Sequence, residues 1–280
     1  MENANDSLSA ADFDRLRVLI RAESGINLGR EKKTMLEIRL KRRLRELSFP
    51  SSAAYCDYVF SREGRTQELV HMIDVVTTNK TDFYREPDHF DYLVAKALPD
   101  LEMRRGANRN VLVWSAGCST GEEPYTLAMV LNEYAQNRAG FGFSILATDI
   151  STAVLDKART GIFRSEAVRP VPPACRKKYL MRSRDPGSDL VRVVPELRAK
   201  IQFRRLNFMD ADYRMSETPE VIFCRNVIIY FDRPTQIRLL EKLTRQLAPG
   251  GYFFAGHSES LQSMDLPLVS AGPAVYRKAA

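Results

Sequence analysis

Apolar residues recur at helical spacing through the first part of the chain. Within each of two sets, apolar residues recur every three or four positions, as on one face of a helix. The first set is Phe13, Leu16, Leu19 and Ile20, and the second is Met35, Leu36, Leu40, Leu44 and Leu47. The pattern predicts further helices over 53–60 and 65–76, after a break at the Ser-Phe-Pro-Ser-Ser segment 48–52. No convincing strand pattern precedes residue 110. We therefore expect a small all-α N-terminal domain over residues 1–90.

From residue 111 onward, short apolar runs alternate with amphipathic helical segments. Strands are predicted at 111–114, 143–147, 201–206, 221–224 and 252–255, and helices at 122–136, 152–159 and 235–247. Strands that alternate with helices at this spacing predict a doubly wound, Rossmann-like α/β sheet over residues 91–280. The segment 266–278 contains a Ser-Ala-Gly-Pro turn and is expected to add an antiparallel hairpin at the sheet edge.

Residues 169–200 interrupt this alternation. They contain several prolines, the turn Asp185-Pro186-Gly187-Ser188, and an apolar-polar alternation from Leu190 to Val194. These are hairpin signals within an α/β domain. The segment therefore predicts a small antiparallel β subdomain inserted at about 169–200.

Composition narrows the class of protein. The chain has 280 residues, of which 44% are hydrophobic and 28% charged, which is typical of a folded globular protein and not of a disordered one. No apolar run approaches the ~20 residues that span a bilayer, and the polar first ten residues do not resemble a secretory signal. We expect a cytoplasmic protein. A net charge of +7 indicates an anionic partner, which charge alone does not identify as nucleic acid, protein or lipid.

The cysteines and histidines give no metal-binding pattern. The four cysteines are scattered without a Cys-x-x-Cys pair, and the three histidines, His71, His89 and His257, stand far apart along the chain. Structural zinc sites and disulfide frameworks need closer or more numerous ligands. We expect reduced thiols and no metal.

Two features follow the first two predicted strands. The turn 115–123 carries Gly117 and Gly121, a spacing that differs from the Gly-x-Gly-x-x-Gly of dinucleotide-binding proteins. Asp149 follows the second strand, where a carboxylate can accept both hydroxyls of a ribose. Taken singly, the turn is consistent with a tight connection and Asp149 with a helix N-cap. Together they predict an adenosine-containing ligand, and acids without nearby lysine or arginine favour a cationic sulfonium over a pyrophosphate.

Four segments carry a resemblance to a known family: TNKTDFYRE at 78–86, WSAGCSTGEEPY at 114–125, FCRNVIIYF at 223–231 and GHSES at 256–260. They strongly resemble the chemotaxis receptor methyltransferases, the CheR family, and the resemblance covers nearly the whole chain in order. It implies an S-adenosylmethionine-dependent O-methyltransferase. The expected substrates are glutamate side chains on the cytoplasmic signalling domain of chemoreceptors, and the products are methyl esters and S-adenosylhomocysteine.

The resemblance also implies which residues hold the cofactor. They correspond here to Asn79, Thr81, Arg85, Glu122, Asp149, Asn207, Phe208, Arg225 and Asn226. Among them, Asp149 would take the ribose, Asn207 and Phe208 would flank the adenine, and Glu122 would lie near the methionine moiety or the sugar.

The chemistry can be argued from the substrate itself. A glutamate carboxylate has a pKa near ~4.3, so at neutral pH it is already a nucleophile and needs no general base. The site must align the carboxylate with the methyl donor and exclude water. Arg85, Arg225 and Tyr230 are the candidate aligning residues. The alternative for Arg225 and Tyr230 is a structural pair that closes the end of the fourth strand.

Two basic regions are candidates for receptor contacts. The segment 30–45 is rich in lysine and arginine, and we expect Arg39, Arg42 and Arg43 to steer docking on an acidic receptor, although a solvated helix face is the ordinary reading. In some members of the family that the chain resembles, the β insertion holds a C-terminal tether peptide of certain receptors, and here Arg182, Arg184 and Arg192 offer contacts to such an acidic peptide. Such contacts would recruit the enzyme to membrane-bound receptor arrays. No exposed apolar stripe demands a partner, so a monomer is expected.

Two other classes of protein fit the sequence less well. Amino-methylating DNA enzymes carry Asn/Asp-Pro-Pro-Tyr/Phe after strand four, where this chain has Arg225-Asn226-Val227-Ile228, and no cysteine follows a proline as cytosine C5 enzymes require. A nucleic-acid methyltransferase is therefore disfavoured, and no nucleic-acid partner is expected. A non-catalytic cofactor-binding adaptor would keep the Gly117–Gly121 turn but need not keep Arg85, Arg225 and Tyr230 together.

Overall fold

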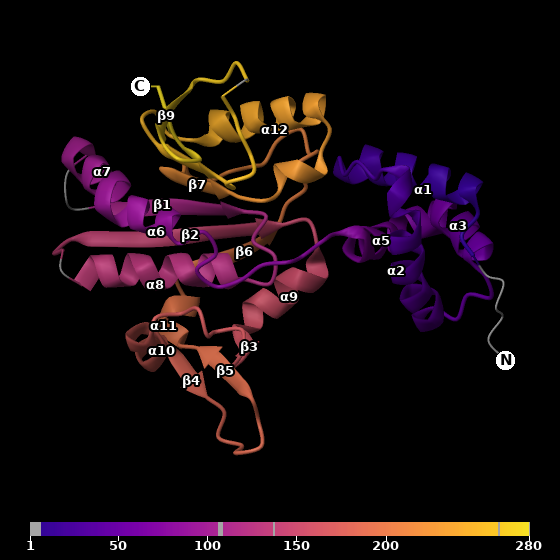
Figure 1. Ribbon diagram of the computed structural model, residues 1–280, viewed down its shortest axis with the longest axis horizontal. Coiled ribbons are helices and arrows are strands. Elements are labelled where there is room, and N and C mark those ends of the chain that lie inside the picture. The colour runs from indigo at the N-terminus through magenta and orange to yellow at the C-terminus, as the bar shows by residue number, and fades with distance from the viewer. Residues whose placement is uncertain (1–6, 106–108, 137, 263, 280) are drawn as a thin grey trace.

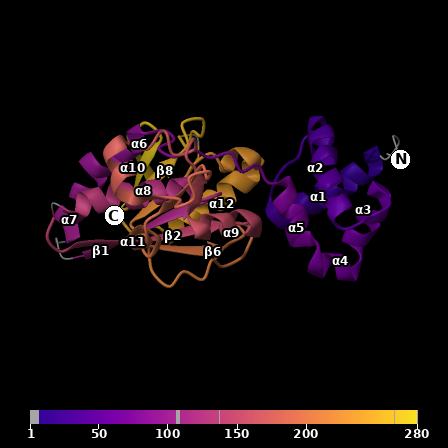
Figure 2. The ribbon, with the colours of Figure 1, turned by 90° about the horizontal axis from the view of Figure 1, so that it is seen from below.

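The structure is a computed structural model that describes residues 7–105, 109–136, 138–262 and 264–279. Figures 1 and 2 show two lobes, one made of N-terminal helices and one built around a sheet. No helix in the described ranges is long and apolar enough to cross a membrane.

The N-terminal lobe confirms the expected all-α domain. Its elements are α1 (Ala10–Ser24), η1 (Arg30–Lys32), α2 (Lys33–Glu46), α3 (Ser52–Phe60), α4 (Arg62–Gln67) and α5 (Leu69–Val76). Their apolar faces share one core, in which Leu16, Leu36 and Tyr55 are fully buried. The helix expected over 65–76 is divided at Glu68, whose buried side chain accepts hydrogen bonds from Arg43 and Tyr55.

The second lobe confirms the doubly wound sheet. Its strands are β1 (Arg109–Ala116), β2 (Phe141–Asp149), β6 (Ile201–Arg205), β7 (Val221–Cys224), β8 (Tyr252–Ala255), β9 (Leu268–Gly272) and β10 (Val275–Lys278). The order is β6-β2-β1-β7-β8-β10-β9. The first five are parallel, whereas β10 runs antiparallel to β8 and forms the expected edge hairpin with β9. β1 has β2 on one side and β7 on the other, which is the switch point where such sheets bind ligands.

Helices cover both faces of this sheet. They are α6 (Asp88–Tyr92), η2 (Leu93–Ala97), α7 (Leu98–Arg105), α8 (Glu122–Gln136), α9 (Thr152–Thr160) and α12 (Arg233–Gln246), and η3 (Ile228–Tyr230) forms a single turn. Figure 1 shows α8 and α12 on opposite sides. Successive strand residues point to opposite faces, so Val113 joins the core beside α8 while Trp114 joins the core beside α12. Because both faces are covered, the strands read as continuous apolar runs.

The inserted β subdomain is present, with one strand more than the sequence indicated. β3 (Ile162–Arg164), β5 (Leu190–Val193) and β4 (Leu180–Arg182) form an antiparallel sheet in the order β3-β5-β4, accompanied by α10 (Pro173–Tyr179) and α11 (Pro195–Arg198). The subdomain thus begins at Ile162 and not near 169. The three-residue run of β3 is too short to show a strand period.

The boundary between the two domains also differs from the expected residue 90. Phe83 and Phe90 are buried in the core of the sheet domain, among residues from α8 and β7. The segment after α5 therefore belongs to the sheet domain, and the helical domain ends near residue 77.

Candidate active site

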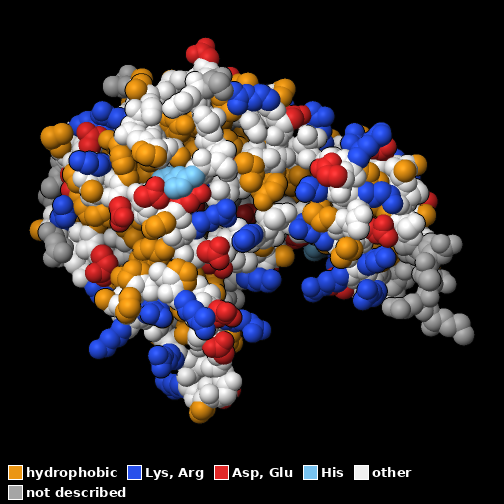
Figure 3. Space-filling model, viewed as in Figure 1, with side chains coloured by type: hydrophobic (Ala, Val, Ile, Leu, Met, Phe, Trp, Pro, Cys, Tyr) orange, Lys and Arg blue, Asp and Glu red, His pale blue; other side chains and the backbone are white. Residues whose placement is uncertain are grey.

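A cavity of about 540 Å³ lies between the helical domain and the carboxyl ends of the strands. Its lining includes nine of the residues that the sequence singled out: Asn79, Thr81, Arg85, Asp149, Asn207, Phe208, Arg225, Asn226 and Tyr230. The wall on the side of the helical domain includes Ser24, Ile26, Asn27, Leu28, Glu31, Lys32 and Met35. Figure 3 shows lysine and arginine side chains on both sides of the hollow between the lobes. Both domains therefore build one site.

Polar contacts hold the helical domain against the sheet domain on two sides of the cavity. Asn27 N donates to Tyr230 O at 2.9 Å, and Asn207 Nδ2 donates to Glu23 O at 2.6 Å. On the α9 side, the Asp74 carboxylate accepts from Thr152 N and Oγ1 at 3.0 and 2.9 Å. These contacts fix the distance between the two walls.

Asp149 lies at the end of β2 with its carboxylate anchored by two backbone amides. Ser119 N donates to Oδ2 at 2.9 Å, and Ser151 N donates to Oδ1 at 3.0 Å. The N-cap of α9 is Ser151, whose own hydroxyl accepts from Val154 N, so the N-cap alternative for Asp149 is wrong. Burial raises the pKa of Asp149. Each oxygen keeps a lone pair for a ligand hydroxyl.

Gly117 is required by packing and backbone conformation. Its φ of +86° is in the left-handed region, and an added Cβ would lie 2.5 Å from Val227 Cγ2. Gly117 N and Cys118 N both donate to Thr148 O, at 2.8 and 2.9 Å, which folds the turn against β2. The turn thereby brings Ser119 N to Asp149.

The two glutamates after this turn take different roles. Glu122 is buried, accepts from Thr120 Oγ1 at 2.6 Å and does not line the cavity, unlike what the resemblance implied. Glu123 does line it and accepts from Ser115 Oγ at 2.6 Å and from Arg225 Nε at 2.8 Å. Successive helix residues point about 100° apart, and nothing in the sequence decides which one turns inward.

Arg225 is held by the protein on several sides. Besides Glu123, its Nη1 donates to Arg85 O at 2.6 Å and lies 3.4 Å from Glu86 Oε2, and the side chain is only 2% exposed. The guanidinium also lies 5.1 Å from the Phe90 ring centre. The structural alternative thus describes Arg225 better than the expected aligning role, since its Nε and Nη1 groups already have partners.

The side chains of Arg85 and Tyr230 have fewer protein partners than that of Arg225. Arg85 Nη1 donates to Lys80 O at 3.1 Å, and no carboxylate of the described residues pairs with it. Tyr230 lines the cavity, and its hydroxyl has no hydrogen-bond partner in the described ranges. Both groups are therefore available to a carboxylate that enters the cavity.

Asn79, Asn207 and Phe208 shape the cavity walls. Asn79 Nδ2 donates to Thr77 Oγ1 at 3.2 Å, and its carbonyl accepts from Ser119 Oγ at 3.0 Å. The Asn207 side chain joins the two domains, whereas Phe208 offers an apolar ring to the cavity. An adenine ring can pack against such a side chain.

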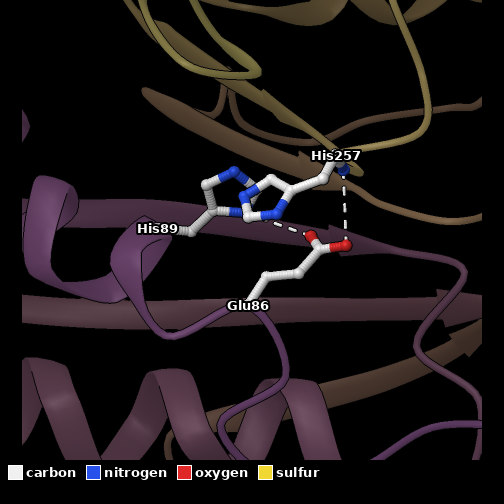
Figure 4. A group of neighbouring side chains, drawn as sticks. All are labelled: Glu86, His89 and His257. Atoms are coloured by element: carbon white, nitrogen blue, oxygen red, sulfur yellow. Dashed lines mark hydrogen bonds and ion pairs between the residues drawn. The ribbon is translucent and has the colours of Figure 1, made fainter.

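Glu86, His89 and His257 gather into one group (Figure 4), with ligand atoms within 4.8 Å of one another. His89 and His257 are thus neighbours in the fold, although their distance along the chain gave no sign of it. However, Arg225 Nη1 lies 3.3 Å from His89 Nδ1 and 3.4 Å from Glu86 Oε2. The Arg225 guanidinium thus already lies against Glu86 and His89, and its positive charge disfavours a metal cation at this group.

Family models match almost all of the chain. Residues 11–77 match "CheR methyltransferase, all-alpha domain", and residues 79–272 match "CheR methyltransferase, SAM binding domain". The chain belongs to the CheR methyltransferase family. Both models meet where the structure separates the helical domain from the sheet domain.

Curated relatives agree over nearly the full length. The chain is 38% identical over 279 residues to a chemotaxis protein methyltransferase of Borreliella burgdorferi, covering 99% of this chain and 97% of that protein. It is 40% identical to chemotaxis protein methyltransferase 2 of Pseudomonas aeruginosa, covering 96% and 93%. For the chemotaxis protein methyltransferase of Escherichia coli, the identity is 39% and the coverage 96% and 91%.

In this CheR family member, the expected receptor-binding arginines do not share one environment. Arg39 Nη1 donates to the carbonyls of Val76 and Thr77 at 2.6 and 2.9 Å, at the end of α5. Arg43 forms two hydrogen bonds to the buried Glu68, at 2.8 and 2.7 Å. Only Arg42 is widely exposed, with 87% of its side chain accessible beside Glu46. Arg39 and Arg43 lie four positions apart and face the protein, so the prediction of an open cationic face is wrong for these two.

Proposed function

We propose that this CheR methyltransferase transfers the methyl group of S-adenosylmethionine to glutamate carboxylates of chemoreceptors, yielding glutamate methyl esters and S-adenosylhomocysteine. One observation supports this most directly. A single cavity at the switch point is lined by an anchored Asp149 and, from other segments, by the available polar groups of Arg85 and Tyr230. The first suits a ribose, and the other two suit a carboxylate.

The residues present fit the cofactor. Asp149 would accept the ribose hydroxyls, and Phe208 would pack against the adenine. Glu123 lines the cavity where Glu122 does not, and so is the better candidate for a glutamate near the methionine moiety. When bound, S-adenosylmethionine supplies an electrophilic methyl group on a sulfonium cation.

The protein's part in the reaction is alignment. An ionised substrate glutamate needs no base, and Arg85 or the Tyr230 hydroxyl can hold one of its oxygens by a hydrogen bond. A tight bidentate grip would stabilise the charged ground state more than the less charged transition state. Arg225 contributes by fixing the carbonyl of Arg85 and the Glu123 carboxylate, and so shapes the site from behind.

The partner is an acidic helical surface of a receptor's cytoplasmic signalling domain. Arg42 can supply long-range attraction from α2, because its charge is exposed. The β subdomain has two edge strands, β3 and β4, and exposed Arg182, Arg184 and Arg192, which suit an acidic tether peptide added as a strand. We place the protein in the cytoplasm as a monomer recruited to receptor arrays.

Calorimetric titration with S-adenosylmethionine and S-adenosylhomocysteine tests the cofactor site. Wild type should bind both in the micromolar range, and Asp149→Ala should lose binding because the ribose hydroxyls lose their acceptor. Asp156→Ala is the matched control, since Asp156 lies on α9, is not part of the cavity lining, and has Arg159 as its one ion-pair partner among the described residues. No binding by wild type would refute the enzyme assignment, and equal binding by Asp149→Ala would refute the role of Asp149.

Base-labile methyl ester formation on a receptor cytoplasmic fragment then tests the substrate. Transfer to glutamates, lost when those glutamates are changed to alanine, is the expected result. Binding of the cofactor without transfer to any receptor fragment would favour the adaptor alternative.

A further inference from the structure

Glu259 holds its carboxylate inside a turn just after β8, beside the segment that carries Tyr230. It accepts from four backbone N–H groups: Gly256 at 2.7 Å, Asn226 at 2.8 Å, Ile228 at 2.9 Å and Ile229 at 3.4 Å. The side chain is buried, and the residue is 4% exposed. An added Cβ at Gly256 would lie 2.8 Å from Glu259 Oε2, so the turn closes tightly around the carboxylate.

Only an ionised carboxylate suits these partners. All four are donors, and a carboxylate has acceptor capacity on both oxygens, whereas a glutamine would turn an NH₂ donor toward some of them. A buried donor that loses its acceptor destabilises the arrangement, so the segment would shift until the donor finds another acceptor. Burial raises the pKa of Glu259, and the amide hydrogen bonds oppose that rise.

These bonds define the shape of the segment 226–230. Asn226 adopts a left-handed conformation, with φ of +58°, and η3 follows without a side-chain N-cap of its own. Ile228 N and Ile229 N lie at the start of η3, where a negative charge is favourable. Glu259 therefore supplies, from a distant part of the sequence, the acceptor that this turn lacks.

A second residue holds the same segment by its carbonyl groups. Gln236 Nε2, on α12, donates to Ile228 O at 2.9 Å and to Phe231 O at 3.0 Å. The amides of the segment are thus fixed by Glu259 and its carbonyls by Gln236. Between these two anchors, Tyr230 lines the cavity, and its carbonyl accepts from Asn27 N of the helical domain.

We infer that Glu259 is a positioning residue for methyl transfer, which acts by fixing the 226–230 segment so that Tyr230 meets the substrate carboxylate. The inference rests on the proposed function, since it assigns Tyr230 to a carboxylate substrate. Glu259 itself does not line the cavity, so any effect on methyl transfer must act through the 226–230 segment.

A double-mutant cycle tests the inference. Methyl transfer to a receptor cytoplasmic fragment is measured at saturating cofactor and receptor for wild type, Glu259→Gln, Tyr230→Phe and the double variant. We expect Glu259→Gln to lower kcat about tenfold or more, but by less than about twofold in the Tyr230→Phe background, because residues that act as a unit are not additive.

Glu220→Gln is the matched structural control. Glu220 is equally buried, at 4% exposed, and its carboxylate accepts from Leu112 N at 2.9 Å at the opposite end of the sheet. We expect it to lower stability without lowering kcat. Should Glu259→Gln fail to fold, Gln236→Ala replaces it in the same cycle and is expected to show the same coupling to Tyr230.

Three results would overturn the inference: an unchanged kcat in Glu259→Gln, an equal loss in both Tyr230 backgrounds, or an equal loss in Glu220→Gln. A wild-type enzyme that binds the cofactor but esterifies no receptor carboxylate would instead refute the proposed function, and the inference with it. Receptor methylation by the wild-type enzyme therefore distinguishes a failure of the Glu259 inference from a failure of the proposed function.

Discussion

Arg225 and Glu123 form a buried ion pair, with Nε and Oε2 2.8 Å apart and side chains 2% and 12% exposed. The pair joins the end of β7 to the first turn of α8, two elements that flank β1. Glu123 also accepts from Ser115 Oγ, and Arg225 also holds the Arg85 carbonyl. The pair thus links the strand that precedes the cofactor turn to the segment that carries Arg85.

Removing the Arg225 side chain should lower the free energy of unfolding. Arg225→Ala leaves the Glu123 carboxylate, which is largely buried at the cavity wall, without its cation, and breaking such a pair costs about 3–5 kcal/mol. Urea unfolding would measure this free energy. Arg159→Ala, which removes an exposed pair with Asp156, should change it by less than about 1 kcal/mol. Equal stabilities for the two variants would contradict the buried role of Arg225.

Arg85 and Tyr230 should instead affect turnover. Neither has a carboxylate partner among the described residues, so Arg85→Gln and Tyr230→Phe should leave the free energy of unfolding within about 1 kcal/mol of wild type. Each should lower kcat for receptor methylation about tenfold to a thousandfold, the range seen when a hydrogen-bond donor to the reacting group is removed. Paired kinetics and unfolding curves check both statements. If kcat is unaffected in both variants, the alignment role belongs to other groups.

His89 should make stability depend on pH. Burial, and then the positive charge of Arg225, lower its pKa from about 6.5 to about 4 in the folded protein. Glu86 and Asp88 oppose this shift, and His257 adds to it. Between these two values the unfolded chain binds a proton that the folded protein does not, so stability falls as pH decreases through this window. The loss is about 3 kcal/mol between pH 6.5 and pH 4.

Unfolding curves of wild type and His89→Gln at several pH values would isolate this contribution. The variant should show a shallower decline in stability below pH 6.5, and the two proteins should have parallel profiles above it. The same slope in both proteins at low pH would show that His89 is not held neutral.

Charge reversal on α2 should separate docking from folding. Arg42 is exposed, so Arg42→Glu should raise KM for receptor, most at low salt, and leave cofactor affinity unchanged. Arg43→Glu would bring a second carboxylate to the buried Glu68 and should lower stability sharply. Receptor titrations at two salt concentrations, with unfolding curves for both variants, test the distinction. An unchanged KM for Arg42→Glu would remove α2 from the docking surface.

The periodicity of apolar residues determined most of the fold. Runs such as 111–114 and 221–224 are apolar at every position because both faces of the sheet are covered, and helices with a 3.6-residue period separate them. Asp149 was also identifiable from its place after a strand, because the carboxyl ends of parallel strands meet at one edge. Local pattern alone is sufficient for such features.

The tertiary structure decided which way a side chain points and which partner it binds, even for residues of the same type that are neighbours in the sequence. Glu122 and Glu123 are adjacent acids, and only packing turned Glu123 to Arg225. Arg39, Arg42 and Arg43 form one cationic run in the sequence. In the structure, however, Arg39 binds a carbonyl at the C-terminal end of α5, and Arg43 binds Glu68 between α4 and α5. His89 and His257 are far apart in sequence but have ring centres 4.7 Å apart. Direction and partner depend on neighbours contributed by distant segments, and the linear sequence carries no local sign of them.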